Sequence, residues 1–273
     1  IKPYLSNNVA QILFTSGSTG NPKGVVLTHQ SIIENLSGIK KMLDIKLETP
    51  KFMAVTPLYH NNGQFIPTLL PLILGGSTVA VDSKSSLLFF WDWIKLYKIN
   101  YTSLMATHIN YFNTLKKKNS YELQSIFCGG AKLDKVSHEI FEKKYKINIF
   151  CNYGLTETSS IVASESLSSR RKGSVGKPLF NNQIKIINKN NDGFGEILIK
   201  GLNLFKCYLL DKILTQKKFN KTFFKSGDLG KLDKDGFLFI KDRIDNMIIV
   251  SGENIYPSDI ENHILNLKDI KFG

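Results

Sequence analysis

Short apolar runs alternate with helix-type segments through roughly the first 155 residues of the chain, and this pattern most constrains the fold. Runs such as "VAQILFT", "STVAV" and "INIFCNYG" have the length and bounding residues of strands. Segments such as "IIENLSGIKKML" and "DKVSHEIFEKKYK" place apolar residues at helical spacing. Such alternation favours a mostly parallel sheet covered by helices on both faces, so we predict an α/β fold with ligands at the carboxyl ends of the strands.

The pattern changes near Gly173, where the segments become short and rich in strand-forming residues. Hairpin signals at Asp192-Gly193 and Asp235-Gly236 predict a small antiparallel β subdomain. Beyond Arg243 the sequence predicts a strand, a turn and a helix. We therefore expect three parts: an α/β part at 1–172, a β-rich subdomain of the same domain at 173–242, and a third segment at 243–273.

The charge of the chain does not favour a nucleic-acid partner. The net charge is +13, but the 36 basic residues include three arginines, Arg170, Arg171 and Arg243, and the lysines are scattered. Arginine is the residue that recognises phosphates and bases through paired hydrogen bonds. We therefore expect no nucleic-acid partner.

Cysteine usage and hydrophobicity indicate a cytoplasmic protein. Cys128, Cys151 and Cys207 are odd in number and far apart, which favours free thiols over disulfides or a metal site. We find no signal peptide and no apolar segment long enough to span a bilayer, since "FIPTLLPLILGG" is short and contains two prolines. The chain starts without methionine and stops just after a helix-type segment, so we expect both termini to be cuts.

The ten residues "TSGSTGNPKG", at 15–24, combine three glycines and four hydroxyl side chains with one lysine. Backbone N–H and side-chain O–H groups of such a loop can surround phosphate oxygens while Lys23 neutralises their charge. The order of residues differs from a Walker A loop, because Pro22 precedes the lysine and Gly24 follows it. A simple glycine-serine turn is the alternative for a string of this kind taken alone.

This string resembles the phosphate loop of the adenylate-forming enzymes, which include acyl- and aryl-CoA ligases, firefly luciferase and the adenylation domains of nonribosomal peptide synthetases. Four further strings resemble motifs of the family in the same order: "NYGLTET", "GEILIKG", "KSGDLG" and "DRIDNMIIVSGENIYPSDIE". Five ordered motifs cover most of the chain. The resemblance implies that 1–172 and 173–242 belong to the large AMP-binding domain, and that 243–273 is the hinge and the start of a truncated C-terminal α+β domain.

The resemblance also implies roles for individual residues. Tyr153 would offer a face to adenine, Asp228 would accept hydrogen bonds from the ribose hydroxyls, and Glu157 would hold Mg²⁺ on the ATP phosphates. Thr156 and Glu157 are the expected catalytic residues beside His60, Asp245 is the expected hinge, and Gly252 would border the CoA tunnel. The expected ATP- and AMP-binding positions are Thr15, Ser16, Gly17, Ser18, Thr19, Gly20, Lys23, Gly129, Gly130, Ala131, Asn152, Tyr153, Gly154, Asp228 and Arg243.

Taken without the resemblance, three of these residues have ordinary structural explanations. Tyr153 is then more typical of a core residue, Glu157 of a solvated charge, and Asp228 of a turn that follows Gly227.

His60, in "PLYHNNG", favours one branch of the family. The string is similar to that of acyl- and aryl-CoA ligases, in which this histidine borders the acyl site. We see no aspartate signature after His60 of the kind that amino-acid-activating members carry. The resemblance therefore implies activation of a simple carboxylic acid, as in fatty acid metabolism, with ATP and Mg²⁺, followed by thioester formation with CoA.

Three departures from the family pattern bear on this expectation. Asp242 and Cys207 stand where the family usually has glycine, and an aspartate with positive φ at 242 would be strained. The C-terminal catalytic lysine of the family does not occur among these residues, so we expect impaired adenylation by this chain. The alternatives are an adenylation domain that loads the phosphopantetheine of a carrier protein and a non-catalytic nucleotide-binding remnant.

Overall fold

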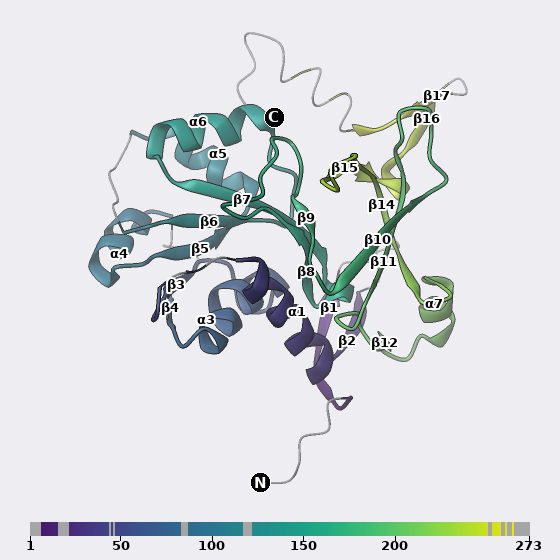
Figure 1. The fold of residues 1–273 in the computed structure, drawn as a ribbon, viewed down its shortest axis with the longest axis horizontal. Coiled ribbons are helices and arrows are strands. Elements are labelled where there is room, and N and C mark those ends of the chain that lie inside the picture. Colours follow the sequence, from purple (N-terminus) through teal and green to yellow (C-terminus); the bar gives the residue numbers. More distant parts are fainter. Residues whose placement is uncertain are drawn as a thin grey trace.

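The computed structural model describes residues 7–15, 22–43, 45, 47–82, 87–116, 122–250, 253–257, 260 and 264. A seven-stranded sheet forms its largest part, with the strand order β4-β3-β5-β6-β7-β8-β9 (Figure 1). The neighbours from β4 to β7 are parallel, and β8 and β9 are added antiparallel. The strands are β3 (Lys51–Ala54), β4 (Ser77–Ala80), β5 (Tyr101–Leu104), β6 (Ser125–Cys128), β7 (Asn148–Leu155), β8 (Ser160–Ser164) and β9 (Lys177–Pro178).

Helices cover both faces of this sheet, as Figure 1 shows. Side chains alternate along each strand, so Phe127 packs into the core below the sheet and Ile126 into the core above it. The predicted α/β class is therefore confirmed. The lower face is covered by α1 (His29–Met42), α2 (Asn61–Gln64), the π-helical turn η1 (Phe65–Leu69) and α3 (Leu70–Ile73), and the upper core contains α4 (Phe90–Tyr97), α5 (Ala106–Thr114) and α6 (Lys135–Tyr145).

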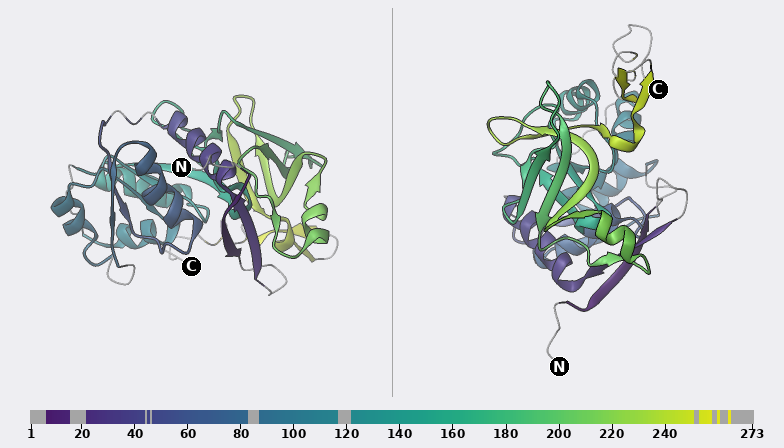
Figure 2. Two further views of the ribbon diagram at one scale, coloured as in Figure 1. Left: turned by 90° about the horizontal axis from the view of Figure 1, so that it is seen from below. Right: turned by 90° about the vertical axis from the view of Figure 1, so that its right-hand side faces the viewer.

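A second, antiparallel sheet follows in the chain and lies beside the first (Figure 2). Its order is β10-β11-β14-β13, and β15 also pairs with β14. Both predicted hairpins are present, since β10 pairs with β11 and β14 with β15. The strands are β10 (Asn182–Ile187), β11 (Gly195–Gly201), β13 (Phe219–Asn220), β14 (Phe223–Leu232) and β15 (Leu238–Arg243), and α7 (Lys212–Lys217) precedes β13.

The loop at 15–24 does not follow a strand of the parallel sheet. It connects β1 (Val9–Thr15) to β2 (Lys23–Thr28), which pair antiparallel in a three-stranded sheet completed by β12 (Cys207–Tyr208). The alternation in the sequence includes the apolar run at 9–15 and so predicts this loop at the carboxyl end of a parallel strand, which is wrong. Thr15 and Lys23 are register partners, so the two ends of the loop lie opposite each other.

The spacing of Ser31 and Glu34 in the sequence predicts a capping box at the start of α1, and the structure has a different one. Thr28 is the N-cap residue, and its hydroxyl accepts a hydrogen bond from the Ser31 N–H while Ser31 Oγ accepts one from the Thr28 N–H. The helix thus begins three residues earlier than predicted, because a buried threonine at the end of β2 satisfies its first N–H groups.

The C-terminal part contains η3 (Ile244–Asn246) and a hairpin of β16 (Ile248–Val250) and β17 (Glu253–Ile255). The helix predicted beyond residue 257 lies mostly outside the described residues. Within the described part of the chain, every helix is too short or too polar to cross a bilayer. Cys128, Cys151 and Cys207 form no disulfide, which agrees with that part of the prediction.

Candidate functional site

A cavity of about 450 Å³ opens between the carboxyl ends of β6 and β7 and the strands β14 and β15. The position agrees with the expectation for an α/β sheet, and the second sheet supplies the opposite wall. Seven of the residues predicted from the resemblance line it: Gly130, Ala131, Asn152, Tyr153, Gly154, Asp228 and Arg243.

Gly129 and Asn152 lie side by side, and Asn152 lines this cavity. A Cβ atom at Gly129 would lie 2.1 Å from Asn152 Oδ1, so any larger residue would displace the amide. Asn152 Nδ2 is buried and has no hydrogen-bond partner among the described residues, although the residue lines the cavity. An unpartnered buried amide is costly, and a hydrogen-bonding ligand in the cavity would satisfy it.

Tyr153, Asp228 and Arg243 form a connected group on the cavity wall. The Tyr153 hydroxyl donates to Asp228 Oδ2 at 2.5 Å, and Arg243 Nη1 lies 3.1 Å from Asp228 Oδ1. Asp228 and Arg243 are also register partners of β14 and β15. Asp228 thus lies within a strand, not in the turn that its sequence also allowed. Each carboxylate oxygen has two lone pairs, so acceptor positions remain for a ligand hydroxyl.

Burial dominates the electrostatics of this group. Asp228 is 4% exposed, and burial raises the pKa of its carboxyl although Arg243 and Tyr153 oppose the change. Burial and the neighbouring Asp228 charge raise the pKa of Tyr153. Tyr153 is 9% exposed and belongs to the main apolar core, so its ring is a core residue that also borders the cavity.

Glu157 lies in the short helix η2 (Thr156–Thr158) that follows β7. Its Oε1 accepts a hydrogen bond from the Tyr208 hydroxyl at 2.7 Å, and its backbone oxygen accepts one from the Phe205 N–H. Tyr208 lies on β12, whose partner β2 begins with Lys23. The sequence analysis names the neighbouring Cys207 but misses the contact of Tyr208 with Glu157.

The predicted phosphate loop is described only at its ends. Ser16, Gly17, Ser18, Thr19 and Gly20 lie outside the described residues. The helix η2 packs against β2, which brings the strand that begins with Lys23 beside the helix that carries Glu157. Lys23, the candidate for phosphate binding, and Glu157, the candidate for Mg²⁺ binding, therefore lie on neighbouring elements.

His60 is exposed and does not line the cavity. It precedes α2, and its ring lies 4.6 Å from that of Tyr59. The next residue, Asn61, donates through Nδ2 to the Leu155 oxygen at 3.3 Å, which anchors α2 at the end of β7. His60 therefore lies near the segment that carries Thr156 and Glu157, and its role stays a prediction.

The departure at Asp242 is not strained. Asp242 lies in β15 and is absent from the non-glycine residues with positive φ in the described chain. Its Oδ1 accepts hydrogen bonds from the Arg243 N–H at 2.6 Å and from Asn246 Nδ2 at 2.9 Å. Asp245, the predicted hinge, lies in η3, and Gly252 lies outside the described residues.

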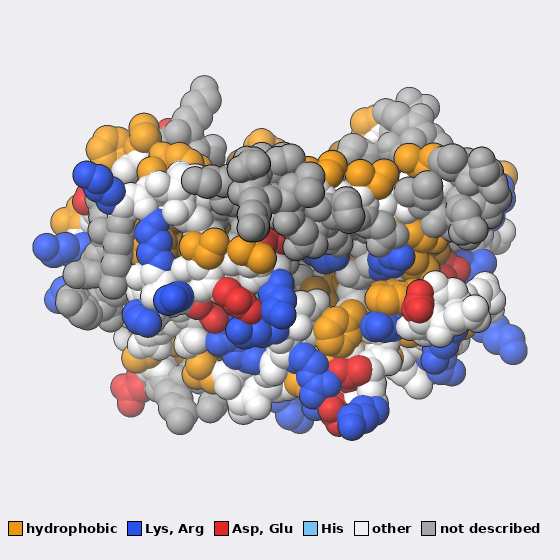
Figure 3. Space-filling model, turned by 90° about the horizontal axis from the view of Figure 1, so that it is seen from above, with side chains coloured by type: hydrophobic (Ala, Val, Ile, Leu, Met, Phe, Trp, Pro, Cys, Tyr) orange, Lys and Arg blue, Asp and Glu red, His pale blue; other side chains and the backbone are white. Residues whose placement is uncertain are grey.

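The surface carries its basic residues in a dispersed pattern on the face in Figure 3, where acidic side chains lie between them. This agrees with the scattered lysines of the sequence. The expectation that nucleic acid is not a partner stays a prediction.

Residues 2–209 match the sequence profile described as AMP-binding enzyme. The 2-succinylbenzoate–CoA ligase of Staphylococcus epidermidis is 34% identical over 258 residues, which are 93% of this chain and 53% of that protein. The chain spans about half the length of the curated relatives it matches.

Solved structures give the same result. The O-succinylbenzoate coenzyme A synthetase of Bacillus subtilis in complex with AMP has a TM-score of 0.87 and 30% identity, covering 97% of this chain and 55% of that one. The same synthetase in complex with ATP and magnesium has a TM-score of 0.86 and 29% identity, covering 96% of this chain and 56% of that one.

Proposed function

This chain belongs to the AMP-binding enzyme family, and on that premise we propose that it supplies the nucleotide site of an AMP-forming acid–CoA ligase. The observation that carries the proposal is the cavity in which Asn152, Asp228 and Arg243 meet. An unpartnered amide and a buried carboxylate with spare lone pairs suit a base and a ribose. The relatives that bind AMP and ATP support this use of the cavity.

We propose the following assignment of roles along the nucleotide. Asp228 accepts the ribose hydroxyls, with Arg243 and Tyr153 holding its carboxylate in place. Gly129, Gly130 and Ala131 allow backbone to approach the base opposite Tyr153. Lys23 and the hydroxyls of the loop neutralise the outer phosphates.

Glu157 fits the Mg²⁺ that accompanies ATP in the Bacillus subtilis relative. It is a half-buried carboxylate, and its Oε1 has one side-chain hydrogen bond, from Tyr208. Hard oxygen ligands of this kind are those that Mg²⁺ prefers. The ion, when bound, would neutralise phosphate charge, and Tyr208 would fix the rotamer of Glu157.

In the whole enzyme, a carboxylate oxygen of the acid would attack the α-phosphorus of ATP and pyrophosphate would leave with the electrons of the broken P–O bond. The CoA sulfur would then attack the acyl carbonyl, AMP would leave, and the thiol proton would pass to solvent. The residues of this chain position the phosphates and neutralise their charge, with no covalent intermediate on the protein.

The acid we propose is aromatic, of the 2-succinylbenzoate type, because the matched relatives carry that name. A fatty acid is the less supported alternative. His60 would border the acid and Asp245 would serve as the hinge, and both roles rest on the resemblance. Carrier-protein loading and nucleotide binding without catalysis remain alternatives.

Isothermal titration of the purified chain with AMP and ATP tests the nucleotide site. We expect 1:1 binding that is weakened in Asp228→Asn, and absence of binding to either nucleotide would contradict the proposal. ATP–pyrophosphate exchange with a panel of aromatic, fatty and amino acids then tests the acid. We expect weak exchange, best with the aromatic acid, and preference for an amino acid would favour carrier-protein loading.

A further inference from the structure

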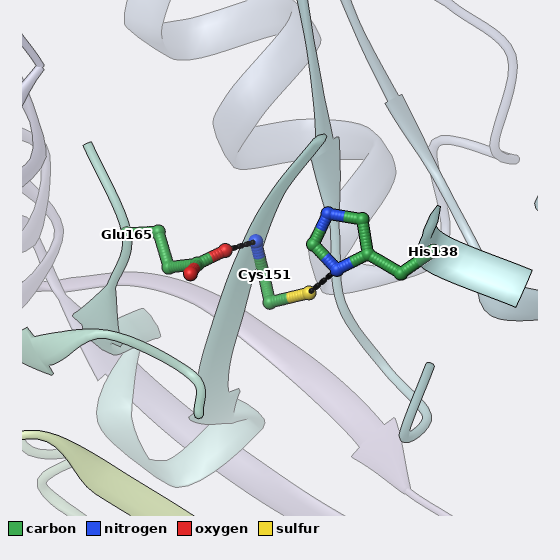
Figure 4. Close-up of side chains that lie close together, drawn as sticks. All are labelled: His138, Cys151 and Glu165. Carbon is green, nitrogen blue, oxygen red and sulfur yellow. Dashed lines mark hydrogen bonds between the residues drawn. The ribbon is translucent and has the colours of Figure 1, made fainter. Parts of the chain in front are cut away.

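Three buried or partly buried side chains that the proposed reaction does not use lie together at the wall of the cavity. They are His138 on α6, Cys151 on β7 and Glu165 just after β8, and Figure 4 shows them pointing toward one another. One ligand atom from each residue lies within 4.8 Å of the other two. We propose that these residues form a site for a thiophilic divalent cation, with Zn²⁺ as the ion.

The separation of the sulfur and the imidazole nitrogen suits this ion. Cys151 Sγ lies 3.8 Å from His138 Nδ1. Bonds of about 2.3 Å to sulfur and about 2.0 Å to nitrogen place the two atoms about 3.5 to 3.8 Å apart at tetrahedral to trigonal angles. The pair therefore needs little movement to bind Zn²⁺.

The neighbours of His138 leave its Nδ1 atom to face the sulfur of Cys151. Its Nε2 lies 3.1 Å from Glu142 Oε1, which also accepts hydrogen bonds from Arg170 and from the Ile149 N–H. Glu142 Oε1 is an acceptor, and Arg170 Nη2, which lies 3.4 Å from Nε2, donates its two hydrogens to Glu142 Oε1 and to the Ile149 oxygen. These neighbours favour the tautomer with the proton on Nε2. The Nδ1 lone pair then faces Cys151, and a carboxylate behind the histidine is the arrangement that metal-binding histidines commonly have.

Glu165 is held in a similar way by the backbone. Its Oε2 accepts a hydrogen bond from the Cys151 N–H at 3.0 Å and its Oε1 accepts one from the Arg171 N–H at 3.1 Å. Each oxygen keeps a further lone pair for a cation. Glu165 is 1% exposed. A cation beside this buried carboxylate would offset the free-energy cost of burying its negative charge without a partner.

The charges of the site balance when Zn²⁺ binds. A thiolate, a carboxylate and a neutral imidazole together offset the two positive charges of the ion. The S–H bond of Cys151 breaks as the S–Zn bond forms, and the proton leaves to solvent. His138 and Cys151 both line the cavity, which provides the entry path and room for water as a fourth ligand.

Direct metal binding tests the proposal, and its outcome does not depend on the proposed enzyme activity. Metal-free protein is titrated with Zn²⁺ against a chromophoric chelator. We expect one equivalent to bind, and the affinity to fall at least about tenfold in Cys151→Ser and in His138→Gln, because each removes one protein ligand. Cys207→Ser is the matched control, since Cys207 lies on β12 outside the cluster, and it should bind as the wild type does.

Substitution with Co²⁺ adds a readout in the wild type itself, which needs no variant. We expect a sulfur-to-cobalt charge-transfer band in the wild type at one equivalent, retained in Cys207→Ser and absent in Cys151→Ser. A wild type without that band, or a folded Cys151→Ser with unchanged Zn²⁺ affinity, would overturn the proposal. Circular dichroism melting curves identify the variants that are folded.

Discussion

The buried position of the Asp228 carboxylate at the cavity lowers the stability of the folded chain. Burial raises the pKa of its carboxyl, so the ionised form is less favourable in the folded than in the unfolded chain. For Asp228→Asn we therefore predict a free energy of unfolding at pH 7 within about 1 kcal/mol of the wild type, or above it. AMP affinity should fall about 10- to 100-fold, because hydrogen bonds to a charged acceptor contribute about 1.5 to 3 kcal/mol.

Urea unfolding and isothermal titration measure the two quantities separately. A variant that loses several kcal/mol of stability would contradict the first part, and one that binds AMP as the wild type does would contradict the second. Asp192→Asn, in an exposed hairpin turn, is the matched control for a lost carboxylate and should leave AMP affinity unchanged.

The raised pKa of Asp228 also predicts a pH dependence of binding. Its carboxylate takes up a proton at a higher pH than an exposed aspartate, whose pKa is about 3.9. Affinity for adenosine should therefore decrease as pH falls from 7 toward about 4, because a protonated Asp228 accepts fewer hydrogen bonds. Adenosine is the suitable probe because it has no titrating phosphate. Asp228→Asn should give a flatter profile, and an equally steep one would contradict the assignment.

The proposed positioning role of Tyr208 can be separated from nucleotide binding that does not involve Mg²⁺. Tyr208→Phe removes the O–H donor to Glu157 Oε1 but keeps the ring, which is buried against Phe205. We predict a loss of about 2- to 10-fold in Mg²⁺-dependent ATP affinity, which corresponds to about 0.5 to 1.5 kcal/mol for one hydrogen bond. AMP affinity without Mg²⁺ should not change. Tyr59→Phe, an exposed tyrosine, is the control, and equal losses in both variants would exclude the role.

The sequence could identify the residues of the site but not their pairing. The motif strings mark Tyr153, Asp228 and Arg243, and all three line the cavity. The bond between Tyr153 and Asp228 joins positions 75 residues apart, and no local spacing encodes it. The bond between Glu157 and Tyr208 was missed for the same reason, since it depends on how β12 pairs with β2.

At the scale of elements, Asn35 joins α1 to the segment that carries Glu157. It is fully buried, and its Nδ2 donates to the Thr158 oxygen at 3.2 Å and to the Ile161 oxygen at 2.6 Å. Asn35→Ala leaves the Ile161 oxygen without this donor, so we predict destabilisation by about 1 to 3 kcal/mol. Thermal unfolding measures this loss. Ile33→Ala, on the exposed face of the same helix, should cost less than about 0.5 kcal/mol.

Most strands and helices were predictable from the sequence, because the apolar residues that each element buries recur at the spacing typical of a strand or a helix. The order of strands and helices through the parallel sheet follows the alternation in the sequence, and both glycine-marked hairpins formed. The capping box was misplaced because Ser31 and Thr28 both offer a hydroxyl, and the N-cap is the one of the two whose backbone is still extended at the end of β2. The loop at 15–24 was assigned to the wrong sheet because its two strands are adjacent in sequence and need no crossover helix.

At the scale of the whole molecule, the cavity connects the two large sheets. Its walls come from β7 on one side and from β14 and β15 on the other. A ligand that binds only the folded chain should stabilise it by about 2.7 kcal/mol at 100 times its Kd, which raises Tm by about 5 to 10 °C for a chain of this size. A thermal-shift titration with AMP measures the effect. Under the same AMP concentrations Asp228→Asn should shift much less, and an equal shift would place AMP elsewhere.

The pairing of β12 with β2 has a consequence for the order in which the protein is made. Cys207 lies opposite Val26, and these register partners are separated by about 180 residues in the sequence. Strand pairs that are so far apart in the chain form slowly during folding. After β1 and β2 have left the ribosome, all the strands of the parallel sheet are synthesised before β12 can pair with β2. Until then one edge of β2 is an unpaired template open to other strands. Nascent chains arrested before residue 207 should therefore be the ones that depend most on chaperones.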